Sequence, residues 1–235
     1  MLKIILTAVL SLSLINASAF AQIPESLERS RTAVLITDPQ NEFLHPKGKL
    51  YPLVKDNLKQ LNTIEHIDQL MNTATRKGYT LAVDPLVYNA LDGEWINAGA
   101  LQRQLLDMQA LHRDNARDGK SFENSGADFY APYKRYIYNG KTIVVAAHKM
   151  YGPESNDLIY QLRSRGIDTV ILGGLVANLC VDSHMRALME NGFKVYVVKD
   201  AVAAPGQEAY QAALVNYGMI ANGVLTTEQA LDLMQ

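Results

Sequence analysis

Cys180 is the residue of this sequence best suited to nucleophilic chemistry. It is the only cysteine and stands in the segment GGLVANLCVDSHMR, Gly173 to Arg186. The preceding run 168–172 is short, apolar and β-branched, which predicts a buried strand, and 181–190 has the spacing of an amphipathic helix. The partial positive charge at a helix start favours a thiolate there. Cys180 is therefore a candidate nucleophile, and the alternative is an ordinary buried cysteine.

Two further groups follow predicted strands in the same way. Asp38 comes directly after the apolar run 32–37, and Lys149 follows the run 142–147 closely. Because the carboxyl ends of parallel strands meet at one edge of a sheet, both side chains are expected near the thiol. Asp38 could take the thiol proton and return it to a leaving group, while Lys149 balances the charges. The alternative for Asp38 is a turn-forming residue before a proline.

Strand and helix patterns alternate through the rest of the chain. This alternation predicts an α/β fold of one domain, with a six-stranded parallel sheet between two layers of helices. The expected strands are 32–37, 79–87, 142–147, 168–172, 194–198 and a short one within 219–224. The expected helices are 57–77, 99–112, 154–165, 181–190, 207–217 and 226–234. The least regular section, 89–138, is expected to shape the substrate pocket.

Two histidines lie close to these residues in sequence. Alternation along the strand before Lys149 predicts that His148 points to the opposite side, in a structural role. His184 follows Cys180 by one helical turn and could face either the pocket or the core. Neither histidine is needed as a base, because Asp38 supplies one.

The composition and the N-terminal residues predict an exported protein. Residues 1–21 combine a lysine, an apolar core and a small-x-small pattern ending at Ala21, which indicates a secretory signal and a mature domain 22–235. We expect a periplasmic or secreted protein that is not held in a membrane after cleavage. The net charge of −2 gives no reason to expect nucleic acid as a partner. A single cysteine allows no intramolecular disulfide.

Four pieces of the sequence resemble the isochorismatase-like cysteine hydrolases, a family that includes nicotinamidases, carbamoylases and other amidohydrolases. They are LITDPQNEF at Leu35 to Phe43, Lys149 after its strand, GGLVANLCV at Gly173 to Val181 and GFKVYVVKDAVAA at Gly192 to Ala204. The resemblance implies a six-stranded parallel sheet and a catalytic triad of Asp38, Lys149 and Cys180. It also implies a small-molecule substrate and a homo-oligomer, either a dimer or a tetramer.

The same resemblance implies further details of the site. A cis peptide is expected between Leu175 and Val176, and the backbone N–H groups of Val176 and Cys180 would form the oxyanion hole. Gln40, Phe43 and Asn178, which lie near the triad in sequence, are candidates for contacts with the substrate.

The sequence departs from metal-binding nicotinamidases, which carry an Asp-x-His pair after the first catalytic loop. The segment 55–59 reads KDNLK, and the five histidines are scattered. We therefore expect no catalytic metal and no other cofactor. A second departure follows Lys149, where 150–157 reads MYGPESND in place of the Ser-Ala-Phe segment of many relatives. The substrate therefore cannot be carried over from the family.

The main hypothesis is a hydrolase that cleaves a small amide or related C–N bond through an acyl-thioester on Cys180. Three alternatives stay open at this point. The first is isochorismatase-type hydrolysis of a vinyl ether, which tolerates loss of the thiol. The second is a non-catalytic exported protein that binds a small ligand. The third is a redox sensor, although the sequence supplies no resolving cysteine.

Overall fold

The sheet confirms the predicted α/β class. The computed structural model describes residues 23–114 and 122–235, so the predicted signal segment 1–21 lies outside the described residues. Six parallel strands stand in the order β3-β2-β1-β4-β5-β6. Their bounds are β1 Thr32–Thr37, β2 Thr80–Asp84, β3 Ile143–Val144, β4 Thr169–Leu175, β5 Lys194–Ala203 and β6 Gly223–Leu225.

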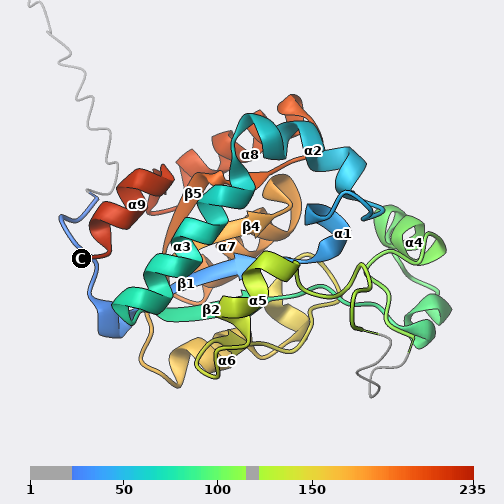
Figure 1. Cartoon of the computed structure of the whole chain (residues 1–235), viewed down its shortest axis with the longest axis horizontal. Coiled ribbons are helices and arrows are strands. Elements are labelled where there is room, and N and C mark those ends of the chain that lie inside the picture. Colours follow the sequence, from blue (N-terminus) through green and yellow to red (C-terminus); the bar gives the residue numbers. More distant parts are fainter. Residues whose placement is uncertain (1–22, 115–121) are drawn as a thin grey trace, which may run out of the picture.

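Helices cover both faces of this sheet (Figure 1). They are α1 Asn41–Leu44, α2 Tyr51–Gln60, α3 Thr63–Lys77, α4 Ala100–Asp107, α5 Lys134–Ile137, α6 Leu158–Arg163, α7 Asp182–Glu190, α8 Gln207–Ile220 and α9 Thr227–Leu233. Along β1, Val34 and Ile36 pack in one core with α3 and α9. Ala33 and Leu35 pack in the other core with α6, α7 and α8. Every residue of β1 is buried, as a central strand of a doubly covered sheet must be.

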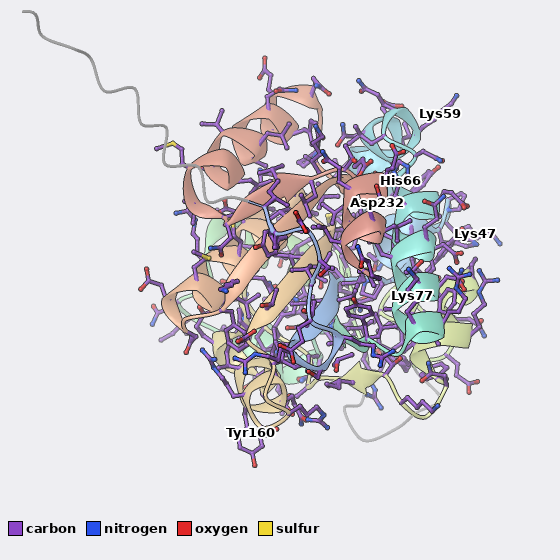
Figure 2. The ribbon with its side chains drawn as sticks, turned by 90° about the vertical axis from the view of Figure 1, so that its left-hand side faces the viewer. Lys47, Lys59, His66, Lys77, Tyr160 and Asp232 are labelled. Atoms are coloured by element: carbon purple, nitrogen blue, oxygen red, sulfur yellow. The ribbon has the colours of Figure 1, made fainter. Side chains whose placement is uncertain are left out.

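The face turned to the viewer in Figure 2 lies away from the carboxyl ends of the strands. There α9, which carries Asp232, packs beside α3, which carries His66 and Lys77. The Lys77 ammonium donates to the carbonyl of Met234, and the Leu27 N–H donates to the carbonyl of Leu233 at 2.9 Å. These bonds hold the first and last described segments together on this side.

Several element boundaries differ from the sequence-based expectation, among them those of α3, α8 and β3. The helix expected over 57–77 is broken at Asn62, whose φ of 52° places it in the left-handed region that asparagine tolerates better than most residues. Helix α8 continues through Gly218 to Ile220, so the sixth strand begins only at Gly223. Strand β3 contains two residues rather than the six expected over 142–147, because it is the edge strand of the sheet.

None of the helices in residues 23–114 and 122–235 has the length and apolar character needed to cross a membrane.

Gly174 allows β4 to approach β1 closely beside Asp38. Its φ is +117°, and a Cβ atom built there would lie 2.2 Å from the Thr37 carbonyl oxygen. Thr37 Oγ1 also donates to the Leu175 carbonyl at 3.0 Å. The peptide between Leu175 and Val176 is cis, as the family resemblance implied. Glycine is therefore required at position 174 to join these two strand ends.

A Gly174→Ala substitution is expected to lower the free energy of unfolding by several kcal/mol or to prevent folding, since it combines a steric clash with an unfavourable φ. The measurement is urea denaturation followed by circular dichroism. The matched control is Gly218→Ala, because nothing lies within 4 Å of the added methyl group on α8. That control is expected to raise stability by up to about 1 kcal/mol. Equal stability of the two variants would contradict the role assigned to Gly174.

Candidate active site

Asp38 and His148 form a fully buried pair at the carboxyl ends of the strands. His148 Nε2 lies 2.9 Å from Asp38 Oδ1, and both side chains are 0% exposed. The other ring nitrogen, Nδ1, lies 2.6 Å from the carbonyl oxygen of Met150. Because a carbonyl and an ionised carboxylate can only accept hydrogen bonds, the ring must carry a proton on both nitrogens. His148 is therefore an imidazolium facing the Asp38 carboxylate.

The surroundings of His148 favour this charged form. Burial lowers the pKa of His148, but the charge and hydrogen bond of Asp38, the charge of Asp84 and the Met150 carbonyl raise it to about 9. The nearby negative charges therefore outweigh the cost of desolvation. The site holds a compact buried cation at neutral pH.

Lys149, which the sequence analysis placed beside Asp38, lies elsewhere. Its ammonium binds the carboxylate of Asp92, a residue of the short 3-10 helix Ala90–Glu94, and its side chain is 28% exposed. The prediction that His148 points away from the site is also wrong. The reason is that β3 ends at Val144, so strict alternation does not extend to residue 148. His148 instead pairs with Leu86 in an isolated parallel bridge.

A second buried pair stands behind the first. His184 Nε2 lies 2.8 Å from Asp84 Oδ2, and Asn156 Nδ2 donates to Asp84 Oδ1 at 2.7 Å. His184 Nδ1 lies 2.7 Å from the carbonyl oxygen of Cys180, and its ring meets the His148 ring edge to face with centroids 5.2 Å apart. The Asp84–His184 pair thus fixes the backbone of Cys180 and packs against the imidazolium.

Cys180 lies on a π-helical turn, Ala177–Val181, that leads into α7. Its sulfur, a carboxylate oxygen of Asp38 and a ring nitrogen of His148 all lie within 4.8 Å of one another. Burial raises the pKa of the thiol well above its usual value, and the negative charge of Asp38 raises it further. The expectation that a helix start would favour thiolate is therefore wrong for the resting site.

The groups expected around the thiol are only partly tested by the geometry. Burial raises the pKa of the Cys180 thiol, whereas the Val176 backbone acts in the opposite direction and lowers it. An oxyanion hole from the N–H groups of Val176 and Cys180 stays a prediction. Asp38 Oδ2 is buried and has no hydrogen-bond partner among the described residues, so it is available to accept a proton.

The three residues proposed for substrate contacts have different environments. Gln40 donates to the carbonyls of Leu86 and Ala127 and accepts from the Leu86 N–H, so its amide is occupied by backbone. Phe43 lines the cavity beside Cys180. Asn178 does not line that cavity, but its side-chain oxygen is buried with no hydrogen-bond partner in the described part of the chain. Gln40 therefore holds neighbouring loop backbone, and contacts of these three residues with a substrate stay a prediction.

A cavity of about 120 Å³ opens beside the sulfur, and we call it the apolar cavity. Its lining residues come from α1, α2, α4 and the loops that follow β2, β3 and β5, as well as from the Cys180 turn. They are Phe43, Leu50, Leu53, Val54, Leu86, Leu101, Leu105, Tyr151, Val176, Leu179, Cys180 and Pro205. In Figure 1, α1, α2 and α4 lie together beyond the end of β1. The cavity therefore sits between the Cys180 turn and these helices.

Two overlapping sets of side chains have the donor atoms of a metal site. They are Asp38, His148 and Cys180, and Asp84, His148 and His184, with the atoms of each set within 4.8 Å of one another. Both sets share His148, whose ring nitrogens already donate to Asp38 and Met150. Ligation would require the loss of these protons, so the absence of a catalytic metal stays the prediction.

Sequence reasoning missed Asp84 and His184 as a pair, although both carried a signal. Asp84 ends β2 just as Asp38 follows β1, and the Asp38 N–H donates to the Asp84 carbonyl at 2.9 Å. His184 lies one turn after Cys180 on the same helix. Strand-end position and helical spacing together would have placed both at this edge.

Comparisons with known proteins identify relatives of this chain. Residues 32–229 match the family model described as the isochorismatase domain. The ureidoacrylate amidohydrolase RutB of Stutzerimonas stutzeri is 26% identical over 198 residues, which cover 82% of this chain and 78% of that protein.

Solved structures share the fold. A cysteine hydrolase from Pseudomonas syringae pv. phaseolicola has a TM-score of 0.75 at 20% identity, covering 93% of this chain and 98% of that one. A nicotinamidase/pyrazinamidase from Bacillus subtilis has a TM-score of 0.63 at 18% identity, with coverages of 83% and 99%. At these identities the likeness concerns the architecture.

The raised pKa of His148 predicts a dependence of stability on pH. Because the pKa rises from 6.5 to about 9 on folding, the stabilisation is fully present below pH 6.5 and is lost as the pH rises through 9. A shift of this size corresponds to roughly 3 kcal/mol. Urea denaturation between pH 6 and 10 measures it, with His148→Gln as the control that lacks this titration. Parallel stability curves for the two proteins would contradict the assignment.

Proposed function

The chain belongs to the isochorismatase family of hydrolases, and from this premise we propose that it hydrolyses a small amide or related C–N bond through an acyl-thioester on Cys180. The observation that carries the proposal is the buried meeting of thiol, carboxylate and imidazolium within 4.8 Å. The relationship to an amidohydrolase supports the choice of a C–N bond. A nucleophile with an adjacent base is the arrangement that covalent acyl transfer requires.

Acylation begins from a neutral thiol. As the Cys180 sulfur attacks the substrate carbonyl, Asp38 accepts the thiol proton, and the carbonyl π electrons move to oxygen. The N–H groups of Val176 and Cys180 stabilise the resulting oxyanion. When the oxyanion collapses, the C–N bond breaks and Asp38 returns its proton to the departing nitrogen. The products of this half-reaction are an amine or ammonia and the Cys180 thioester.

Deacylation uses the same groups with water as the nucleophile. Asp38 takes a proton from water as its oxygen attacks the thioester carbonyl, and the tetrahedral intermediate forms at the same oxyanion site. Collapse breaks the C–S bond, and the proton held by Asp38 returns to sulfur. The carboxylic acid leaves and the starting thiol is restored.

His148 takes the place in this mechanism that the family resemblance implied for a lysine. Its positive charge lies 2.9 Å from Asp38 Oδ1 and stabilises the carboxylate between proton transfers. Because both ring nitrogens are engaged with oxygens, the imidazolium keeps its protons through the cycle and acts through its charge. We therefore propose a Cys180–Asp38–His148 triad in place of the expected set with Lys149.

The apolar cavity favours amide hydrolysis over the alternative from the same family. Isochorismate carries two carboxylates, whereas no charged side chain is among the described residues that line the cavity. A carboxylate placed there would lose its hydration without gaining a partner. This observation makes the vinyl ether reaction the weaker candidate.

Replacement of the nucleophile tests the covalent mechanism. Cys180→Ala is expected to lower the release of ammonia from butanamide by about 10³-fold or more, since the residues of a triad act as a unit. Intact-protein mass spectrometry after brief exposure to 4-nitrophenyl butanoate is expected to show one butanoyl group on the wild type and none on the variant. Turnover that survives loss of the thiol would overturn the thioester route.

The choice between His148 and Lys149 has its own test. His148→Gln is expected to lower kcat/KM by about 10² or more because it removes the charge beside Asp38. Lys149→Met is the matched control and is expected to change kcat/KM by only a few-fold, since Lys149 pairs with Asp92.

The pH profile separates the charge of His148 from a merely structural role. In the wild type, kcat/KM is expected to fall as the pH rises through about 9, where the imidazolium loses its proton. His148→Lys is expected to keep activity and to move this fall to higher pH, because a lysine has a higher ordinary pKa. An unchanged profile in that variant would contradict the role of the charge.

A further inference from the structure

The geometry points to the chemical class of the acyl group. We infer that the part of the substrate attached to the scissile carbonyl is a short, uncharged, apolar chain that binds in the apolar cavity. This inference rests on the proposed function, because it takes the Cys180 sulfur as the attacking atom. Cys180 is one of the residues that line the cavity, so a carbonyl under attack by its sulfur has an apolar wall beside it for the acyl chain.

Two helices far from the triad in sequence supply much of the wall. Leu50, immediately before α2, and Val54 on α2 are 4% and 1% exposed, and Leu105 on α4 is 6% exposed. Gln40 holds the backbone of Leu86 with two hydrogen bonds of 2.9 Å: its Nε2 donates to the Leu86 carbonyl, and its Oε1 accepts from the Leu86 N–H. The cavity is therefore a preformed apolar surface rather than a gap between mobile groups.

Each of the carboxyl groups nearest the sulfur is already hydrogen-bonded to a histidine. Asp38 faces His148 and Asp84 faces His184, in both cases with 0% exposed side chains. The described lining contributes aliphatic and aromatic carbon, the sulfur and the side chain of Tyr151. A charged acyl group would thus be desolvated without a counter-ion, which the site strongly disfavours.

The size of the cavity limits the length of the chain. At roughly 30 Å³ for each water-sized group, about 120 Å³ holds about four such groups. The cavity also reaches the surface at Leu53, which is 59% exposed, so it is open to solvent at one side. An acyl chain of about four carbons beyond the carbonyl fits, and a much longer chain has to pass Leu53.

The first test compares primary amides by ammonia release. From acetamide to pentanamide, kcat/KM is expected to rise about fourfold for each added methylene and to stop rising beyond pentanamide. Succinamate, which resembles butanamide but ends in a carboxylate, and ureidoacrylate are expected to react at least 100-fold more slowly than butanamide. Equal or faster turnover of the anionic amides would overturn the inference.

Cavity variants test the location of the chain. Leu101→Ala on α4 removes part of the lining and is expected to shift the optimum toward hexanamide or longer amides. The control is Leu91→Ala, because Leu91 is 71% exposed and is not part of the lining. Thermal unfolding of both variants confirms that each is folded before rates are compared. An unchanged chain-length profile in Leu101→Ala would place the acyl group elsewhere.

A readout that needs no amide turnover separates this inference from the proposed function. An aldehyde adds reversibly to the thiol, forming a C–S bond while the carbonyl oxygen takes the thiol proton. Butanal is expected to protect Cys180 from iodoacetamide at concentrations at least 10-fold lower than succinic semialdehyde. If butanal protects but no amide is cleaved, the apolar cavity stands and the proposed reaction fails. If neither aldehyde is preferred while amides are cleaved, the reaction stands and the inference fails.

Discussion

The buried contact between Asp38 and His148 is the interaction on which the rest of the site depends. Two opposite charges at 2.9 Å with no solvent exposure are tolerable only when their remaining hydrogen-bonding atoms are satisfied or reserved for a reaction. The carbonyl of Met150 takes the second imidazolium proton, and the Asp84–His184 pair packs against the ring. Of the polar side-chain atoms of Asp38 and His148, only Asp38 Oδ2 lacks a hydrogen-bond partner among the described residues, and this is the oxygen the proposed chemistry needs.

The same pair explains why the thiol rests in its neutral form. Burial and the charges of Asp38 and Asp84 raise the pKa of Cys180, and they outweigh the effect of its position at the start of a helix. A neutral thiol reacts more slowly with alkylating agents and oxidants than a thiolate does, which is relevant for the only cysteine of the chain. Reactivity then depends on a substrate carbonyl that draws electron density from sulfur while Asp38 removes the proton.

Features that depend on where the strands lie and end could be predicted from the sequence. The parallel sheet, the positions of Asp38 and Cys180 at strand ends and the end of α7 at Glu190 all follow from local patterns. The choice between His148 and Lys149 could not be made from the sequence. These neighbours point to opposite sides of the chain, so an error of one residue in the alternation of side chains exchanges them. The regular alternation of side chains stops where β3 ends after Val144 at the sheet edge, and no local sequence pattern marks that point.

The apolar cavity was unpredictable for a different reason. Its walls come from α2 and α4, whose apolar spacing looks like that of any helix packed on a core. Only the placement of these helices beyond the strand ends turns core-like leucines into a substrate surface (Figure 1). The buried side chains of Gln40 and Glu42 form hydrogen bonds with loop backbone. The Glu42 carboxylate accepts from the N–H groups of Lys49 and Leu111, and the Gln40 side-chain oxygen accepts from the Leu86 N–H. The residues of the proposed reaction thus lie at the strand ends, whereas the residues proposed to select the substrate lie on α2 and α4. The hydrogen bonds of Gln40 and Glu42 hold the loops between these elements in place.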